Sequence, residues 1–445
     1  MIYTTIKGIV KISLSVFFKK IVVTGSENIP DHGPMIIVAN HPNTFMDPLI
    51  IGTITEQRIG FVANAGIFSN KLLITVLRYF HVIPIFRKKD IAPGEKPDNK
   101  EAFIKCHEYL DQSGTLLIFP EGSSYYELKL REIKTGTARI ALSFEELKKF
   151  QGNLKILPVA LDYSDSLQFR SMVSITVNPP LYTHVYKEAY LRNEFDGVKA
   201  LTEDIRKALA KNIPRTSGKE QEDFLIKAHK FYTAFYEPGA DLYENPKRSL
   251  ELRTQLSKVF HYIYVHDTGL YHDTETKVHA FFSGLKSEGL TAGFFTDQFL
   301  RTNKALVCLG YLSKLLLLLP FYLFGILTNY LPYILPSKIF QSLKIDIEYK
   351  TSVQMVSGMI TFPLFYALEI WIFRHYVSAD LRSTLLFMVA LPVTGYITMY
   401  YWTELQRFAR VIRFCFFMKP REKVKLRELR DEILDRMEEA RKSLS

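Results

Sequence analysis

Residues 35–50 read MIIVANHPNTFMDPLI and place a polar loop directly after a short apolar run. The run, 35–39, has the length and composition of a strand that is buried on both faces. In the loop, His41 precedes Asp47 by six residues, and Pro48 follows directly. Two interpretations stand side by side. Asp47 is the N-cap of a helix that begins at Pro48, or Asp47 orients His41 as a general base.

Five further apolar runs predict an α/β fold around a mostly parallel central sheet. Each run is bounded by turn residues, and helical patterns at 99–112 and 136–149 lie between some of them. Strands that alternate with helices of this length are typical of α/β domains. The predicted strands after the first are 58–63, 82–86, 115–119, 155–161 and 174–178.

The composition favours a protein that works at a membrane. The 445-residue chain is 47% hydrophobic and 13% aromatic, and its net charge is +11. A basic chain suits nucleic acid, an anionic membrane surface or an anionic substrate. Arginines interleave with aromatics at 407–419, directly after an apolar run, which favours the lipid surface over nucleic acid.

The three cysteines are far apart and form no CxxC pair, so we predict no disulfide and no structural zinc site.

Three apolar runs after residue 300 predict membrane-spanning helices, at 305–335, 355–377 and 383–402. Runs of this length match the hydrocarbon core of a bilayer. We expect Pro320 and Pro332 to break the first run into a re-entrant element, so that both chain ends stay on the cytoplasmic side. The alternative is that the runs are core helices of a large soluble protein.

The chain is thereby predicted to consist of five regions. The first, at 1–20, is an amphipathic helix, and its pattern of apolar residues with lysines runs over 6–24. This pattern suits either a helix on an anionic membrane surface or one packed on the next domain. The others are the α/β domain at 21–185, a helical region at 186–300, the membrane region at 305–402 and a basic helical tail at 407–445.

Further polar and basic residues follow the predicted strands. Within FPEGSS, residues 119–124, Glu121 and Gly122 come directly after a strand. Arg87 follows the predicted strand at 82–86, and Lys134 lies just before the helical pattern at 136–149. Sites in α/β proteins gather where parallel strands end, and basic side chains there bind anions such as phosphate. The alternative for each residue is a solvated surface charge.

These blocks, in this order, resemble the glycerolipid acyltransferases, the family that includes lysophosphatidate and glycerol-3-phosphate acyltransferases. The family signature runs N-H-x(4)-D, then a block that ends near a basic residue, then F-P-E-G, then a V-P-V-like strand. The matching blocks in this chain, all within residues 21–185, are Asn40-His41 with Asp47, Phe86-Arg87, Phe119-Pro120-Glu121-Gly122, and Leu157-Pro158-Val159.

Two departures make the chain most similar in motif form to the glycerol-3-phosphate or dihydroxyacetone-phosphate acyltransferase branch. The spacing from His41 to Asp47 is one residue longer than the common pattern. After the glycine, Ser123 and Ser124 stand where many members have Thr-Arg. That arginine helps to hold phosphate in those members, so the identity of the acceptor stays open.

The resemblance implies an integral membrane enzyme with its catalytic domain on the cytoplasmic side. Such an enzyme moves a fatty acyl group from acyl-CoA or acyl carrier protein to a hydroxyl of glycerol-3-phosphate, dihydroxyacetone phosphate or lysophosphatidate. It implies membrane lipids as partners, and no nucleic acid, metal or cofactor beyond the acyl donor. The alternative is a non-enzymatic membrane scaffold or transporter with an α/β domain.

The same resemblance assigns roles to the site residues. His41 is the general base and Asp47 its orienting partner. Asn43 and Thr44 line the pocket or only shape its loop, and Glu121 either orders the loop or binds the acceptor hydroxyls. The residues assigned to the acceptor are Arg87, Glu121, Gly122, Ser123, Ser124 and Lys134.

Overall fold

The computed structural model describes residues 2–67, 71–87, 98–237 and 245–442, and the chain divides into two compact units. The first comprises Met1–Ser217, Tyr243–Thr254 and Asp346–Ser352. The second comprises Gly218–Leu242, Gln255–Ile345 and Val353–Ser445.

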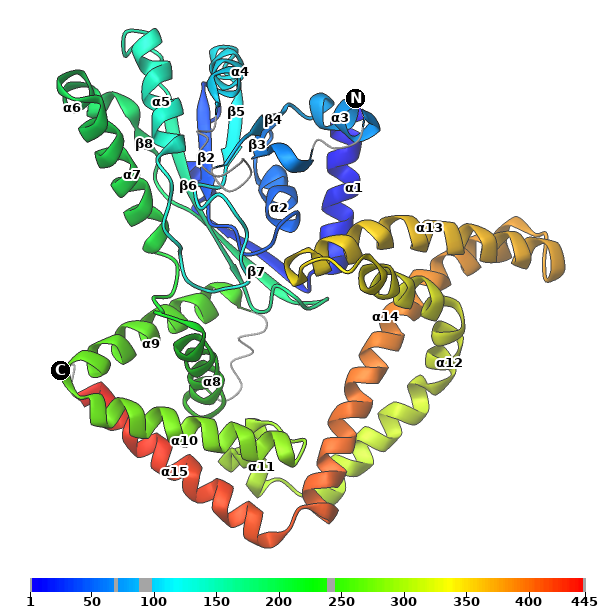
Figure 1. Cartoon of the computed structure of the whole chain (residues 1–445). Helices are drawn as coiled ribbons and strands as arrows, with labels where there is room; N and C mark the ends of the chain where they lie inside the picture. Colours follow the sequence, from blue (N-terminus) through cyan, green and yellow to red (C-terminus); the bar gives the residue numbers. More distant parts are fainter. Residues whose placement is uncertain (1, 68–70, 88–97, 238–244, 443–445) are drawn as a thin grey trace. The chain divides into compact units, whose positions relative to one another are not determined.

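The first unit is built on a sheet whose strands run in the order β1-β7-β6-β2-β5-β3-β4, with β8 paired to β6 (Figure 1). Neighbouring strands are parallel, except that β6 pairs antiparallel with β7 and β8. The predicted α/β fold with a mostly parallel sheet is therefore confirmed, and every predicted strand is present. The strands are β1 (Lys20–Thr24), β2 (Met35–Ala39), β3 (Ile59–Asn64), β4 (Val82–Ile85), β5 (Thr115–Ile118), β6 (Lys155–Tyr163), β7 (Met172–Val177) and β8 (Leu181–Tyr182).

Two of these strands have no counterpart in the sequence prediction. β1 was included in the N-terminal helical pattern, but helix α1 ends at Phe17 and the chain becomes a strand at Lys20. The β-branched residues of KIVVT suit an extended chain, and β1 pairs with β7 over its whole length. β8 has two residues, which is too short to leave a periodic pattern in the sequence.

Helices cover both faces of the sheet, and this explains the continuous apolar run of β2. Ile36 and Val38 point into a cluster that also holds residues of α4, α5 and α7. Met35 and Ile37 alternate to the opposite face and are equally buried. Figure 1 shows α1 and α2 on that side. The helices up to residue 210 are α1 (Ile2–Phe17), α2 (Met46–Ile54), α3 (Lys71–Tyr79), α4 (Lys100–Asp111), α5 (Gly136–Leu147), α6 (Lys187–Arg192) and α7 (Glu194–Ala210).

Helix α1 packs on the first unit with one face and exposes apolar residues on another. Leu14 and Phe17 are buried, and Lys7 bonds the carboxylate of Glu56 at 3.3 Å. Packing on the neighbouring domain is therefore one of its roles. The exposed apolar residues suit a lipid surface as well. They are Ile2, Ile9, Ile12 and Val16.

The second unit is helical. Among the described residues, three helices are long and apolar enough to cross a membrane: Lys304–Leu343, Ile347–Tyr376 and Leu381–Phe417. Little of their apolar surface is buried within the protein, as expected of helices that face lipid. The helices from residue 219 on are α8 (Lys219–Tyr236), α9 (Pro246–His266), α10 (Thr268–Ser287), α11 (Asp297–Arg301), α12 (Lys304–Leu343), α13 (Lys350–Tyr376), α14 (Leu381–Ile412) and α15 (Pro420–Lys442).

Helix α12 is continuous, so the predicted break at Pro320 and Pro332 is wrong. A proline removes one backbone hydrogen bond, and helices in a membrane tolerate this loss when neighbouring helices support them. Here α14 packs along α12. A Cβ atom at Gly325 would clash with Thr394 and Thr398 of α14, so the two backbones approach closely at that glycine.

The helical tail restricts how often the chain crosses a bilayer. Helix α15 packs on α10, where Arg436 bonds Asp273 at 2.6 Å and Lys277 bonds Glu432 at 2.5 Å. Two charged helices that pack on each other lie on the same side of a membrane. If the apolar helices between α10 and α15 span a bilayer, the chain crosses it an even number of times, and three full crossings do not satisfy this condition.

We predict that α10 and α15 are accessible from one side and the α13–α14 connection from the other. Single cysteines at Lys286, Glu428 and Ala379 would be placed in a variant whose three native cysteines are replaced. In sealed vesicles of one orientation, an impermeant thiol reagent is expected to label the cysteines at Lys286 and Glu428, and to label the one at Ala379 only after permeabilisation. In vesicles of the opposite orientation, it is expected to label only the cysteine at Ala379 before permeabilisation. Opposite labelling of Lys286→Cys and Glu428→Cys would contradict the packing of α15 on α10.

Candidate active site

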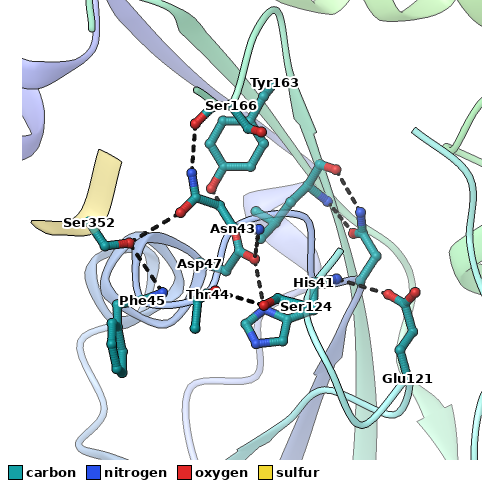
Figure 2. Close-up of polar contacts among 12 residues, drawn as sticks. His41, Asn43, Thr44, Phe45, Asp47, Glu121, Ser124, Tyr163, Ser166 and Ser352 are labelled. Carbon is teal, nitrogen blue, oxygen red and sulfur yellow. Dashed lines mark hydrogen bonds and ion pairs between the residues drawn. The ribbon is translucent and has the colours of Figure 1, made fainter. Parts of the chain in front are cut away.

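The structure brings His41 and Asp47 together at the end of β2. Nδ1 of His41 lies 2.8 Å from Oδ2 of Asp47 (Figure 2). The imidazole stacks on the ring of Phe119 with centroids 3.8 Å apart. The Asp47 side chain is fully buried, whereas 13% of the His41 side chain is exposed. Among the described residues, none bonds Nε2 of His41, so this nitrogen is open to a substrate.

Asp47 is not the N-cap of α2, and this expectation is corrected. The helix begins at Met46 with Phe45 as its N-cap residue, and no side chain caps it. The carboxylate turns back towards the preceding loop, where Oδ2 accepts the backbone N–H of Asn43 at 2.8 Å. The fixed φ of Pro48 is tolerated in the first helical turn, where Pro48 is the third helical residue and not the first as predicted.

Tyr163 completes the surroundings of Asp47 and was missed in the sequence. Its hydroxyl donates to Oδ1 of Asp47 at 2.5 Å from the end of β6, the strand next to β2. Burial raises the pKa of Tyr163 well above its usual value, so the phenol stays a donor. The position of Tyr163 just after the predicted strand at 155–161 could have identified it, because site residues in α/β proteins gather where parallel strands end.

Burial also acts on the carboxylate of Asp47 itself. It raises the pKa of Asp47, and the bonds from His41, Tyr163 and Asn43 act in the opposite direction. A buried carboxylate needs such donors, because its ionised form is otherwise strongly disfavoured. Three donors, two from the loop after β2 and one from the end of β6, therefore hold this carboxylate in place.

The loop that carries His41 is anchored on both sides of the histidine. The Asn40 side chain donates to the backbone oxygen of Leu161 at 2.8 Å and accepts from its N–H at 2.7 Å. Oε1 of Glu121 accepts the His41 N–H at 2.9 Å, and Oε2 accepts the Arg131 N–H at 3.1 Å. Burial raises the pKa of Glu121, against these two bonds. Of its two predicted roles, the geometry favours ordering of the loop.

Arg87, which follows β4, reaches the loop after β5 that carries Glu121 and Gly122. Its guanidinium donates to the backbone oxygen of Gly122 at 2.7 Å and to the hydroxyl of Ser123 at 3.1 Å. Gly122 has φ of +73°, a conformation that other residues rarely adopt. The hydroxyls of Ser124 and Thr44 are 2.7 Å apart, which links this loop to the histidine loop. Arg87, Gly122, Ser123 and Ser124 thus lie together.

Lys134 is placed differently from the other predicted residues. Its backbone N–H donates to Pro120, next to Glu121, but its side chain is 64% exposed. The ammonium lies 3.4 Å from the carboxylate of Glu132, in a pair that is screened by solvent. Within the part of the chain that the structure describes, no group of three His, Cys, Asp or Glu residues is arranged to hold a metal ion.

Comparisons with known proteins find similarity to acyltransferases. Residues 20–162 match the Acyltransferase family model and form an acyltransferase domain. An uncharacterized acyltransferase of Schizosaccharomyces pombe is 23% identical, over 44% of this chain and 42% of the relative. A 1-acyl-sn-glycerol-3-phosphate acyltransferase of Borreliella burgdorferi is 28% identical, over 41% of this chain and 67% of the relative.

Two further matches extend the comparison. Glycerol-3-phosphate O-acyltransferase 1 of Saccharomyces cerevisiae is 23% identical, over 43% of this chain and 37% of the relative. The crystal structure of the 1-acyl-sn-glycerophosphate acyltransferase PlsC from Thermotoga maritima aligns with 47% of this chain and 77% of its own, at 20% identity and a TM-score of 0.35. The matched segments span less than half the length of the two yeast relatives.

We predict that Glu121→Gln lowers the free energy of unfolding by about 1–3 kcal/mol, the usual effect of leaving a buried donor unpaired. The His41 and Arg131 N–H groups bond different oxygens of Glu121, and in glutamine an NH2 donor, which cannot accept a hydrogen bond, replaces one of the two. Thermal unfolding of the detergent-purified protein measures the effect. Glu132→Gln is the control, since the Glu132 side chain is 86% exposed. Equal stability of the two variants would show that the bonds of Glu121 do not hold the loop.

Proposed function

We propose that this chain is a membrane-bound glycerolipid O-acyltransferase. In the proposed reaction a fatty acyl group passes from the thioester of acyl-CoA or acyl carrier protein to a hydroxyl of a glycerophosphate acceptor. The acceptor is glycerol-3-phosphate, dihydroxyacetone phosphate or lysophosphatidate. The observation that carries the proposal is the His41–Asp47 pair at the end of β2, in which Nδ1 of His41 lies 2.8 Å from Oδ2 of Asp47.

His41 is the general base of this reaction. Its Nε2 accepts the proton of the acceptor hydroxyl while the oxygen attacks the thioester carbonyl. Asp47 holds Nδ1–H and stabilises the imidazolium that forms. When the tetrahedral intermediate collapses, the C–S bond breaks and the leaving thiolate takes the proton from Nε2. The products are an ester and a free thiol, and no metal or cofactor enters the proposed reaction.

Arg87 is the proposed anchor of the acceptor phosphate. An arginine guanidinium matches two phosphate oxygens with parallel hydrogen bonds. Its position against Gly122 and Ser123 supports this role, because it presents the guanidinium at the edge where the strands end. Ser124 supplies a further hydroxyl, and Lys134 adds a more distant positive charge.

The proposed location is a membrane with the catalytic domain on the cytoplasmic side, where acyl donors are made. Three apolar helices support membrane association. An even number of crossings between α10 and α15 supports a tail on the same side as the helices that precede the membrane region. We propose that α13 and α14 form the crossing hairpin, with the short connection between them on the far side.

Replacing the base separates an enzyme from a scaffold or transporter. We predict that His41→Ala lowers kcat by roughly 10²–10⁴, the usual contribution of a general base, in an assay of labelled acyl donor with a panel of acceptors. Asp47→Asn is expected to lower kcat as well. His32→Ala, which removes an exposed histidine outside the site, is the control. Full turnover by His41→Ala in correctly folded protein would refute the mechanism.

Neutralising the proposed phosphate anchor tests the acceptor assignment. We predict that Arg87→Gln raises the KM for the acceptor about 10- to 100-fold, because a lost hydrogen bond to a charged group costs roughly 1.5–3 kcal/mol. The KM for the acyl donor is expected to stay the same. Lys134→Gln should have a smaller effect, since Lys134 is exposed, and Arg139→Gln on the surface of α5 serves as the control. A rise in the donor KM instead would assign Arg87 to the donor.

A further inference from the structure

The catalytic loop has a neighbour that comes about three hundred residues later in the chain. Residues 346–352 belong to the first unit, and their last three residues form the first turn of α13. The same helix is one of the three that are apolar enough to cross a membrane. Within this turn, Thr351 and Ser352 are each only 1% exposed.

Both hydroxyls bond the side chain of Asn43, which is itself 1% exposed. Figure 2 shows the bond between Ser352 and Asn43. Nδ2 of Asn43 donates to Oγ1 of Thr351 at 2.6 Å, and Oδ1 of Asn43 accepts from the hydroxyl of Ser352 at 3.2 Å. Nδ2 also donates to the backbone oxygen of Ser166 at 2.8 Å, to which Thr351 donates at 3.1 Å. The amide of Asn43 is thus bonded on every side.

Further contacts join the same two segments. The backbone N–H of Phe45 donates to Oγ of Ser352 at 3.3 Å, and the ring of Phe45 meets the ring of Tyr349 edge to face, with centroids 5.6 Å apart. Both contacts are made by Phe45, two residues after Asn43. The loop between β2 and α2 is therefore supported at Asn43 and at Phe45 by residues 349–352.

Asn43 connects this support to the reacting pair. Its side chain is held by Thr351 and Ser352, while its backbone N–H donates to Oδ2 of Asp47. The same oxygen accepts from His41. A shift of the Asn43 side chain would move the backbone N–H of Asn43, which holds Oδ2 of Asp47. The imidazole of His41, which bonds the same oxygen, would move with it.

We propose that Thr351 and Ser352 are positioning residues for the His41–Asp47 pair, and that the first turn of an apolar helix is thereby part of the catalytic site. The proposal rests on the proposed function, because positioning is defined by the proton transfer at His41. It adds a role that no motif of the acyltransferase domain contains, since residues 351–352 lie far outside 20–162. A packing contact alone would not require hydroxyls at these two positions.

The experiment compares substitutions that differ in the hydroxyl and little in shape. Thr351→Val removes the partner of Nδ2 of Asn43, and Thr351→Ser restores it. Ser352→Ala and Ser352→Thr form the second pair. Thr361→Val is the matched control, because it removes a hydroxyl of the same helix that bonds the backbone oxygen of Pro332.

We expect Thr351→Val to lower kcat about 10- to 100-fold with both KM values unchanged, as for a misplaced catalytic group. Thr351→Ser and Thr361→Val are expected to stay close to the unmodified enzyme. Near-normal kcat for Thr351→Val would overturn the proposal. A loss that Thr351→Ser does not restore, or one that appears in KM, would also overturn it.

A second measurement needs no acyl transfer and separates this proposal from the proposed function. Hydrogen–deuterium exchange reports the N–H groups of Asn43 and Phe45, which bond Asp47 and Ser352. We expect faster exchange of both in Thr351→Val and Ser352→Ala, and unchanged exchange in Thr361→Val. An unmodified protein that acylates no acceptor refutes the proposed function. In that event faster exchange still supports the anchoring of the loop, and unchanged exchange overturns it.

Discussion

A carboxylate without any solvent contact is the constraint on which the site depends. Asp47 is fully buried, and an ionised carboxylate in such a place is stable only when donors surround it. The histidine ring, a backbone N–H of the same loop and a phenol from β6 supply those donors. Each donor must be held in turn, which explains why Asn43, Glu121 and the end of β6 are fixed so firmly.

Sequence reasoning located the residues of the site that lie in local motifs. The residues after the run at 35–39 left Asp47 as a helix cap or as the partner of His41, and the structure has His41 and Asp47 2.8 Å apart at the strand end. Tyr163, Thr351 and Ser352 carry no such local pattern. Their roles depend on which strand lies next to β2 and on where α13 begins, and a single sequence does not encode either in its neighbouring residues.

The fold shows the same division between local and distant information. The continuous apolar strands predicted a parallel sheet buried on both faces, and the sheet has that form. The errors concern ends and interruptions. β1 was joined to α1 because both are apolar with lysines, and α12 was divided at its prolines because isolated propensity disfavours proline in a helix. The packing of α14 along α12 overrides that propensity.

The side chain of Asn40 has a further consequence for the shape of the sheet. Its amide bonds both the N–H and the backbone oxygen of Leu161, as the backbone of one more strand residue would. The hydrogen bonding between β2 and β6 is therefore extended by one position, where the Asn40 side chain takes the place of a backbone group of β2. The main chain is released from the strand direction at residue 40, and the His41 N–H is free to turn towards Glu121 rather than towards β6. The backbone of β2 thus ends at Ala39, while the Asn40 side chain continues the hydrogen bonding to β6.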